Sequence, residues 1–408
     1  MSALLPDNGP RRLLAAVTLF NMVGYGVYLT AGVLYFTRGV HLPAAEVGAG
    51  LSIAGAVSLA TGIPVGHLAD RRGARGVYAA TLALGAAAMA GLCLVDQFWS
   101  FLGFASLVAV AQATAPAARS PLVREFGGEK PAEFRAYLRS VTNIGISVGA
   151  LLAGWGVEVG TKHAYVLLLA GSAVCSAVCA GAVLLLPAVA PAPSPAGSRW
   201  VALKDRPYAL LTVLDGVMAI QYRVLTAALP LWLVDETSAP RWSVSAVMLV
   251  NTAIVVFFQV PASRSIDTPK AGGIAFRRAG FAFLGSCAAI SLLAGVPTWL
   301  AMTLLLVAVV VHTVGELWHA AGGFEVSFAL APPESVGQYQ GLFGMGLGLG
   351  VTVGPVLLIS LCIDWGRPGW WVVGALFAVT GLAVPRAVRL AERRLRQTEQ
   401  ESPEAVSA

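Results

Sequence analysis

The chain has 408 residues, of which 57% are hydrophobic and only 12% are charged, whereas an average soluble domain carries about 25% charged residues. A protein folded in water could not bury this much apolar surface, so the composition predicts a membrane protein. The net charge of +6 does not indicate a nucleic-acid partner, because the basic residues lie in short clusters between apolar runs.

Twelve apolar runs are long enough to cross a bilayer, since a helix needs about 20 such residues to span the hydrocarbon core. Only helices are compatible with these runs, because backbone polar groups in lipid require partners within their own segment. The predicted spans are residues 12–37, 46–68, 76–95, 98–121, 135–158, 163–186, 207–234, 242–264, 274–295, 298–328, 338–363 and 369–388. We therefore predict an all-α membrane protein with 12 transmembrane helices in two pseudo-symmetric six-helix bundles.

A proline-rich segment separates the two sets of six spans. The sequence PAVAPAPSPAGSRWVALKDR occupies residues 187–206, and its four prolines cannot continue a helix. The predicted domains are an N-terminal bundle over residues 1–186, a cytoplasmic linker over 187–206, a C-terminal bundle over 207–390 and a cytoplasmic tail over 391–408.

Basic residues are distributed unevenly between alternate loops. With both termini cytoplasmic, 22 of the 27 Lys and Arg residues fall in cytoplasmic segments and 4 in external ones, while Arg223 lies within a span. Cytoplasmic loops of membrane proteins are enriched in Lys and Arg. The sequence therefore predicts a multi-pass protein of the inner (plasma) membrane with both termini in the cytoplasm.

Two turns half the chain apart share a pattern. Pro64 precedes Asp70 by six residues after the second span, and Pro261 precedes Asp267 by six residues after the eighth, at an offset of 197. Matching internal landmarks of this kind are typical of transporters built from two repeats.

Spans 5 and 11 also match each other. Gly145 and Gly149 are four residues apart in span 5, and Gly350 and Gly354 are four apart in span 11. Small residues at this spacing let membrane helices approach closely. We therefore expect close helix contacts at these glycines.

The turn after the second span carries a motif. It reads GHLADRRGAR and matches the pattern G-x-L-a-D-r-x-G-r-[KR] through Gly66, Leu68, Ala69, Asp70, Arg71, Gly73 and Arg75. Ala74 replaces one Arg of the pattern. On this motif and the two-half arrangement, the chain resembles the major facilitator superfamily over nearly its whole length. The resemblance implies a secondary transporter that works by alternating access.

The resemblance also implies that the motif acts as a conformational latch. Asp70 is expected to accept hydrogen bonds from a helix N-terminus of the opposite half, where the helix dipole favours an anion. Arg71 and Arg75 are expected to tie neighbouring helix ends or lipid phosphates. Asp267, which has few flanking arginines, is expected to form a weaker second latch.

Two features leave the direction of transport open. Proton-coupled exporters of the family often carry an Arg in the middle of span 4, where this chain has Gln112, with Arg119 nearer the cytoplasm. The exporter-associated motif of span 5 lacks its proline. Antiport is therefore compatible with the sequence without being required by it.

Ionisable residues inside the predicted spans are functional candidates, since a charge at the centre of a span costs at least ~2.5 kcal/mol. Span 7 contains Asp215 and Arg223, which lie a quarter-turn apart on a straight helix and cannot pair directly. Span 10 contains His312, Glu316 and His319, whose spacing places them on one helix face.

Three interpretations of the span 10 residues are open. His312, Glu316 and His319 could supply three metal ligands, but zinc sites usually read H-E-x-x-H with a further ligand, and we predict no metal site. Desolvation disfavours the charged form of a carboxylate, and histidine titrates near neutral pH. We therefore predict that these three residues and Asp215 couple transport to protons. Polar packing between helices is the third possibility.

The resemblance implies that spans 1, 4, 7 and 10 line a central cavity. The candidate cavity residues are polar or aromatic side chains within spans, namely Asn21, Tyr25, Tyr28, Gln112, Asn143, Tyr222 and Arg223. The first three recur at i, i+4 and i+7, which places them on one face of a helix. Interhelical hydrogen bonds explain such polar stripes nearly as well.

The leading functional hypothesis is a secondary active transporter that exports small hydrophobic or cationic compounds by proton antiport. Alternatives are proton-coupled uptake, export of a neutral or anionic metabolite such as a sugar or organic acid, and, remotely, a membrane-embedded enzyme or lipid-handling protein. The sequence contains no nucleophile–base set or phosphate-binding loop, so we predict no enzymatic activity and no cofactor. The expected partners are a small-molecule substrate, protons and the lipid bilayer, with no nucleic acid, and the protein is expected to be a monomer.

Overall fold

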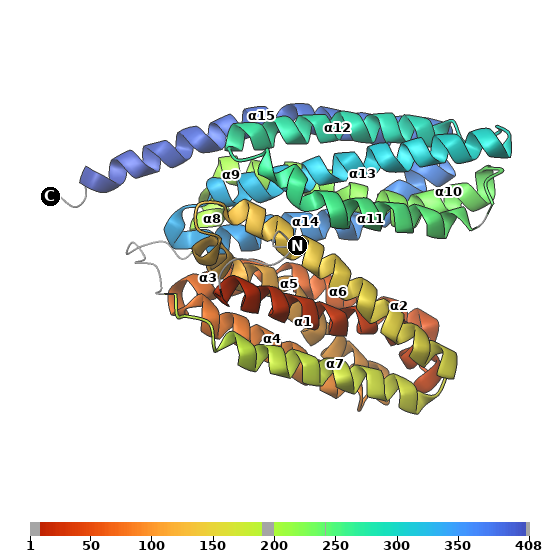
Figure 1. Cartoon of the computed structure of the whole chain (residues 1–408), viewed down its shortest axis with the longest axis horizontal. Helices are drawn as coiled ribbons and strands as arrows, with labels where there is room; N and C mark the ends of the chain where they lie inside the picture. Colours follow the sequence, from red (N-terminus) through yellow and green to blue (C-terminus); the bar gives the residue numbers. More distant parts are fainter. Residues whose placement is uncertain (1–8, 190–199, 241, 405–408) are drawn as a thin grey trace. The chain divides into compact units, whose positions relative to one another are not determined.

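Helices make up nearly all the regular structure of the computed structural model, which describes residues 9–189, 200–240 and 242–404 (Figure 1). Within these ranges, one isolated bridge between Thr237 and Ala294 is the single non-helical pairing. In the same part of the chain, 11 helices are long and apolar enough to cross a membrane, and a bent helix pair supplies a twelfth span. The all-helical fold with twelve spans is therefore confirmed. Residues 190–199 of the predicted linker and 405–408 of the predicted tail lie outside the described residues.

The first compact unit comprises Met1–Trp200 and Pro333–Gly344. Its helices are α1 (Gly9–Leu34), the π-helical turn η1 (Tyr35–Gly39), α2 (Ala44–Leu59), α3 (Gly62–Arg72), α4 (Ala74–Leu92), α5 (Phe98–Gly127), α6 (Pro131–Val159) and α7 (Lys162–Val183). The bent pair consists of Glu46–Leu59 and Gly62–Arg72, which meet at 44°. Since Gly62–Arg72 continues past the predicted span end at residue 68, the motif residues up to Arg72 are helical.

The second compact unit comprises Val201–Pro332 and Met345–Ala408. Its helices are α8 (Val201–Lys204), α9 (Arg206–Ala219), η2 (Ile220–Arg223), η3 (Val224–Ala228), α10 (Leu229–Glu236), α11 (Ser243–Arg264), α12 (Pro269–Ser291), α13 (Thr298–Ala329), α14 (Val336–Leu358), η5 (Ile359–Asp364) and α15 (Arg367–Glu404). The first turns of α14, after the short turn η4 (Pro333–Ser335), belong to the first unit. The last span and the first part of the predicted tail form one continuous helix, α15.

Span 7 is not a continuous α-helix. A 3₁₀ turn (η2) and a π turn (η3) separate α9 from α10. Pro230 stands in the first turn of α10, and its ring nitrogen has no hydrogen to donate to the Thr226 carbonyl four residues earlier. The chain therefore widens into a π turn just before this proline, and the irregular segment carries Gln221 and Arg223.

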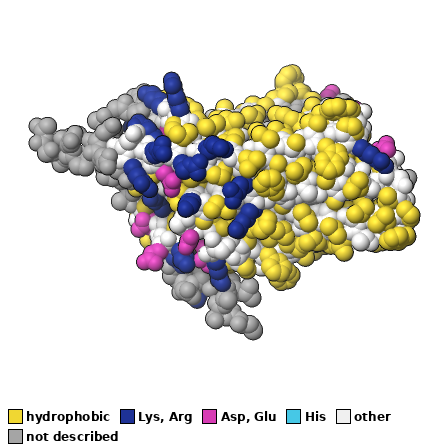
Figure 2. Space-filling view, turned by 90° about the horizontal axis from the view of Figure 1, so that it is seen from above, with side chains coloured by type: hydrophobic (Ala, Val, Ile, Leu, Met, Phe, Trp, Pro, Cys, Tyr) yellow, Lys and Arg dark blue, Asp and Glu magenta, His cyan; other side chains and the backbone are white. Residues whose placement is uncertain are grey.

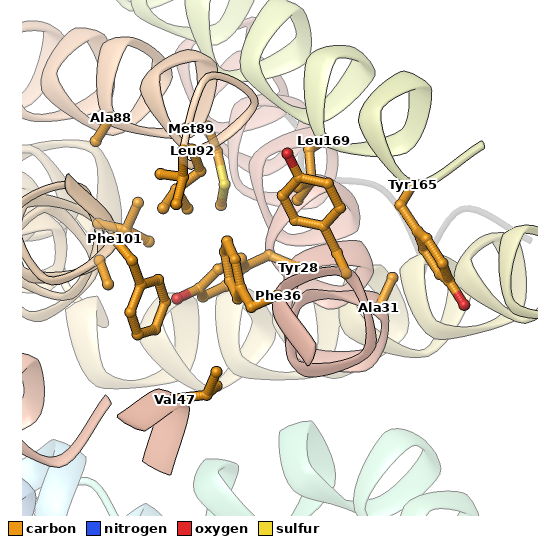
Figure 3. Packing of buried hydrophobic residues seen from close by; sticks show 14 of the residues in the cluster. Tyr28, Ala31, Phe36, Val47, Ala88, Met89, Leu92, Phe101, Tyr165 and Leu169 are labelled. Carbon is orange, nitrogen blue, oxygen red and sulfur yellow. The ribbon is translucent and has the colours of Figure 1, made fainter. Parts of the chain in front are cut away.

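An aromatic core packs the spans of the first unit together. The rings of Phe36 and Phe101 lie 4.5 Å apart, and Met89 and Leu92 of α4 pack in the same cluster (Figure 3). Tyr28, which was predicted to line a cavity, is only 9% exposed and belongs to this core. Because lipid is as apolar as these side chains, close van der Waals packing rather than water exclusion holds such helices together.

The molecular surface matches a protein that lipid surrounds. On the face shown in Figure 2, hydrophobic side chains cover most of the surface, and Lys and Arg gather toward one end. Exposed apolar side chains such as Leu151, Val178 and Phe257 occur on spans of both units. Together with the twelve spans, this surface identifies a multi-pass membrane protein.

Glycines bring equivalent helix pairs into backbone contact in the two units. A Cβ atom on Gly149 of α6 would lie 2.1 Å from the Val23 carbonyl oxygen of α1. In the second unit, a Cβ atom on Gly350 of α14 would lie 1.9 Å from the Gly216 carbonyl oxygen of α9. Real Cβ atoms do not approach so closely, so only glycine fits at either place. The predicted close helix contacts are confirmed here.

We expect Gly149→Val to lower the stability of the protein by about 1–3 kcal/mol, the usual cost of forcing a larger side chain into a packed interface. The control is Gly154→Val on the same helix, because no atom lies within 4 Å of a Cβ atom at that position. Thermal unfolding of the detergent-solubilised proteins measures the difference. Equal unfolding temperatures for the two variants would contradict the backbone contact.

Candidate functional site

Asp215 and His319 form a buried pair inside the second unit. Asp215 lies in the third turn of α9 and His319 lies on α13, with His319 Nε2 3.0 Å from Asp215 Oδ1 and side-chain exposures of 1% for His319 and 4% for Asp215. Buried ionisable groups are stable only when a partner satisfies them. Each group of this pair therefore satisfies the other in an environment with almost no solvent.

Aromatic rings shield this pair. The ring centroid of His319 lies 5.8 Å from that of Tyr222, 5.2 Å from that of Phe276 and 6.4 Å from that of Phe283. Apolar surroundings strengthen a hydrogen bond and make unpaired polar atoms costly. Within the described part of the chain, Asp215 Oδ2 and His319 Nδ1 have no hydrogen-bond partner. The pair therefore keeps one free acceptor and one free ring nitrogen, which a proton or a polar ligand can use.

His312 makes a second polar contact between spans 7, 9 and 10. Its side chain is fully buried, and Nε2 lies 3.0 Å from Gln221 Oε1 and 3.3 Å from the Gln221 carbonyl oxygen. Because a carbonyl oxygen only accepts, Nε2 carries the hydrogen. Nδ1 lies 3.4 Å from Ser286 Oγ, which donates to the Ala308 carbonyl oxygen at 2.9 Å.

Glu316 faces a different helix. Asn251 Nδ2 of α11 donates to Glu316 Oε2 at 2.9 Å and to Thr313 Oγ1 at 3.1 Å. The face that helical spacing gives to the three span 10 residues is therefore divided, because His312 and His319 contact span 7 while Glu316 contacts α11. Among the described residues, no three His, Cys, Asp or Glu side chains are grouped to hold a metal ion.

Arg223 satisfies a carbonyl group that a proline leaves free. Arg223 Nε donates to the Val351 carbonyl oxygen of α14 at 3.1 Å. Pro355 follows Val351 by four residues inside α14 and has no N–H, so the Val351 carbonyl lacks its helical partner. Gly354 leaves room for the arginine, whose Cγ lies 3.0 Å from the place of a Cβ atom on that glycine.

The candidate cavity residues of the first unit occupy varied environments. Asn21 is 4% exposed, and its Oδ1 accepts a hydrogen bond from Ser176 Oγ at 3.1 Å. The ring of half-buried Tyr25 lies 6.2 Å from that of Tyr28 in the aromatic core. Gln112 on α5 and Asn143 on α6 are half-buried. Asn21 and Tyr28 thus have packing partners within the unit, and the role of all five in a substrate cavity stays a prediction.

Asp70 caps the start of α14 within the first unit. Its carboxylate is buried, with Oδ1 accepting from the Gly337 N–H at 2.7 Å and Oδ2 accepting from the Gln338 N–H at 2.9 Å. Both N–H groups belong to the first turn of α14, where backbone donors have no partner inside the helix. The positive end of the helix dipole also favours the carboxylate. The predicted contact of Asp70 with a helix N-terminus is present, while its effect on conformational change stays a prediction.

Glycines let the two backbones meet beside Asp70. A Cβ atom on Gly66 would lie 2.0 Å from the Gly337 carbonyl oxygen, and one on Gly341 would lie 2.4 Å from the Gly62 carbonyl oxygen. On each helix the two glycines are four residues apart, so they share one face. The first glycine of the motif therefore has a steric role.

The remaining motif residues end α3 and hold the following turn. Gly73 has a φ of +96°, a conformation that other residues rarely adopt, and it stands between α3 and α4. Arg75 Nη1 donates to the Leu186 carbonyl oxygen just beyond α7 at 2.9 Å. Arg71 is exposed. Only one of the two predicted arginine contacts, that of Arg75, therefore involves a neighbouring helix end.

The second turn of the repeat differs from the first. Asp267 is exposed. Within the described residues, its carboxylate accepts no hydrogen bond of the kind that Asp70 accepts from a helix N-terminus. The start of α12 is capped by Thr268, whose Oγ1 accepts from the Ala271 N–H at 3.2 Å. The predicted role of Asp267 as a weaker latch therefore rests on an exposed carboxylate alone.

Sequence reasoning missed the neutral partners of the ionisable residues. Gln221, Asn251 and Ser286 hold His312 and Glu316 in place, yet the search of the spans selected charged groups and histidines. An amide inside an apolar run is the signal that could have found the first two. No local pattern marks Ser286, because a serine inside a membrane helix usually bonds its own backbone.

Comparisons with known proteins place the chain among membrane transporters. A family model described as Major Facilitator Superfamily matches residues 14–315. The multidrug resistance protein MdtH of Aeromonas hydrophila is 26% identical over 388 residues, which cover 91% of this chain and 93% of that protein.

Solved structures share the fold. A bacterial homologue of the iron transporter ferroportin in an outward-facing state matches with a TM-score of 0.74 at 12% identity, covering 95% of this chain and 100% of that one. The fucose:proton symporter FucP of E. coli matches with a TM-score of 0.72 at 13% identity, covering 94% and 98% of the two chains. The human organic anion transporter MFSD10 matches with a TM-score of 0.65 at 14% identity, covering 92% and 100%.

Proposed function

This chain belongs to the Major Facilitator Superfamily, a family of membrane transporters, and on that premise we propose that it exports small hydrophobic or cationic compounds in exchange for protons. The observation that carries the proposal is the buried contact between an acid and a base inside a span, Asp215 and His319, at 3.0 Å. Similarity to a protein named for multidrug resistance supports export of such compounds. Membership of a transporter family also supports the interpretation that the protein is not an enzyme. The proposal places the protein in the inner membrane, with both termini cytoplasmic.

Competition at Asp215 provides the exchange in this proposal. The deprotonated carboxylate attracts a cationic substrate, and a proton arriving from outside neutralises it and releases that substrate. His319 keeps the carboxylate in position through Nε2 and shares its proton. Glu316, held by Asn251, is a second acid that can act in the same way. Exchange follows because proton and substrate bind with different affinities to the two conformations of the transporter.

We propose that the Asp70 contact stabilises one of those conformations. Two backbone N–H groups donate to one carboxylate, and charge-assisted hydrogen bonds of this kind are about twice as strong as neutral ones. The glycine faces around Gly66 and Gly337 let the contact form without displacing side chains. Breaking it would shift the balance between conformations toward the other state.

Arg223 favours a second candidate function, which is transport of a neutral or anionic metabolite, including uptake together with protons. A guanidinium group has five N–H donors, and in the described residues Arg223 uses only Nε, toward Val351. The other donors match a carboxylate or phosphate in two-pronged geometry. No acidic side chain among the described residues pairs with Arg223, so its charge is available to an anion.

A flux assay in proteoliposomes tests the proposed function. The purified protein is reconstituted, a pH gradient is imposed, and transport of matched cationic, neutral and anionic compounds is recorded. In antiport, substrate moves toward the acidic compartment while protons leave it. We therefore expect acidification of the receiving compartment to accelerate transport of cationic compounds, and a protonophore to abolish this acceleration. Gradient-driven movement of anionic compounds alone would replace this function with the second candidate, and flux indifferent to the gradient would overturn proton coupling.

A further inference from the structure

Arg119 is a half-buried cation inside the first unit. It lies on α5, eight residues before the end of that helix at Gly127, which corresponds to about 12 Å along the axis. The positive-inside count places Arg119 with the cytoplasmic segments, but the structure shows that α5 continues beyond it. Arg119 therefore lies within α5, the helix that forms span 4, and not in a loop.

The partners of Arg119 are neutral hydroxyl groups. Arg119 Nη1 donates to Thr18 Oγ1 of α1 at 3.0 Å, and the guanidinium also hydrogen-bonds to the side chain of Tyr78 on α4. Thr18 and Tyr78 are 1% and 2% exposed. Neither group carries a charge that could balance the arginine.

Among the described residues of the first unit, no acid pairs with Arg119. Helix neighbours three and four residues away are Ala115, Pro116, Leu122 and Val123, and within the described residues no carboxylate forms an ion pair with the guanidinium. An arginine in a span requires a counter-charge or contact with water, because lipid cannot solvate it. A guanidinium has five N–H donors, so several remain available beyond the two hydroxyl groups.

Comparison of the two repeats shows which residue of the second unit corresponds to each partner in the Arg119–Thr18 contact. Residues of span 1 are matched to residues of span 7 at the offset of 197 that relates the two repeated turns, Pro64 to Pro261 and Asp70 to Asp267. Spans 3 and 4 correspond to spans 9 and 10 at an offset of 200, because Gly85 meets Ala111 as Gly285 meets Val311. At these offsets, Thr18 corresponds to Asp215 and Arg119 corresponds to His319.

The two units thus carry the same interhelical contact with different chemistry. In the second unit, His319 contacts the carboxylate of Asp215 at 3.0 Å. In the first unit, Arg119 contacts the hydroxyl of Thr18 at the same separation of 3.0 Å. A basic side chain is present in both places, but the chain supplies a carboxylate beside it in only one of them.

We propose that Arg119, together with the hydroxyl groups of Thr18 and Tyr78, binds one oxyanion group, either a carboxylate or a phosphate. The guanidinium donates two parallel hydrogen bonds to two oxygens of the anion, as it does to carboxylates and phosphates in general. The hydroxyl groups can then turn to donate to the same anion. The group can belong to a dissolved anion or to the headgroup of an anionic lipid, which offer the same chemistry. This site is separate from the proton exchange proposed for the second unit.

Thermal unfolding of the purified full-length protein tests the site. The unfolding temperature is measured in neutral lipid with inorganic phosphate or acetate against chloride at equal ionic strength, and separately in phosphatidylglycerol against phosphatidylcholine. We expect one of these anions to raise the unfolding temperature by several degrees. A rise with phosphate or acetate identifies a dissolved anion, whereas a rise with phosphatidylglycerol alone identifies a lipid headgroup.

Variants separate a specific site from a general effect of charge. Arg119→Gln is expected to abolish the rise, Arg119→Lys to retain part of it, and Arg38→Gln, at an exposed arginine, to retain it fully. Thr18→Asp is expected to raise the unfolding temperature without any added anion and to abolish the response, because it supplies the carboxylate present in the second unit. Because Thr18→Asp retains Arg119, it still tests the site if Arg119→Gln does not fold. An equal response of wild type and Thr18→Asp, or no response of the wild type to any of the anions, would overturn the site.

Discussion

Asp215→Asn is expected to reduce flux driven by a pH gradient at least about ten-fold, which corresponds to ~1.4 kcal/mol or more in the coupled step. Asparagine keeps the size of the side chain and an oxygen that can accept from His319, so the contact seen at 3.0 Å can persist. It cannot bind or release a proton. The measurements are gradient-driven flux and binding of a cationic compound, and both are expected to fall, because the carboxylate that takes up the proton also attracts the substrate in the proposed exchange.

The matched control is Asp235→Asn. Asp235 lies on α10 of the same span and is exposed, so the change removes the same charge without disturbing a buried pair. His319→Gln is expected to act like Asp215→Asn, while Glu316→Gln reports on the separate contact with Asn251. Normal gradient-driven flux in Asp215→Asn, at equal amounts of reconstituted protein, would remove Asp215 from the proton pathway. A loss confined to Glu316→Gln would assign the proton site to Glu316 instead.

Gly66→Val is expected to abolish transport while the protein remains folded. A Cβ atom at this position would lie 2.0 Å from the Gly337 carbonyl oxygen, so α3 and the first turn of α14 must separate. The two hydrogen bonds to Asp70 would lengthen as a result, and hydrogen bonds to charged groups contribute ~1.5–3 kcal/mol each. Flux in proteoliposomes and the unfolding temperature in detergent together distinguish lost function from lost folding.

Gly55→Val controls for valine in the same bent span. No atom lies within 4 Å of a Cβ atom on Gly55, so this variant should transport normally. Asp70→Asn should have a smaller effect than Gly66→Val, because the amide oxygen can still accept one of the two backbone hydrogen bonds. Transport at the wild-type rate in Gly66→Val would show that the backbone contact does not contribute to the transport cycle.

The number and type of helices could be predicted from the sequence because each span needs its own run of apolar residues. The ends were predicted less well, since polar residues can continue a helix once it leaves the lipid. Thus α5 extends to Gly127 and α15 extends to Glu404, past the predicted ends at residues 121 and 388. The 44° bend between Glu46–Leu59 and Gly62–Arg72 also escaped prediction, although Pro64, in the first turn of Gly62–Arg72, has no N–H to donate to the Ala60 carbonyl at the break.

The candidate site was predicted in its charged members but not in their pairing. Helical spacing separated Asp215 from Arg223, but the single face that it gave to His312, Glu316 and His319 is divided between contacts to span 7 and to α11. The partner of each residue comes from another helix, as with His319 for Asp215 and Asn251 for Glu316. Such contacts depend on how two helices are rotated and shifted against each other, which a single sequence does not encode locally.

The residues tolerated at positions 223 and 355 depend on each other, although proline at position 355 has no polar side chain. The proline withholds a backbone hydrogen, and the arginine 132 positions earlier in the chain supplies a replacement to Val351. An alanine at position 355 would restore the helical hydrogen bond and compete with the guanidinium for the same carbonyl. Substitutions at the two positions are therefore not independent, and the residue tolerated at one of them is set by the residue present at the other.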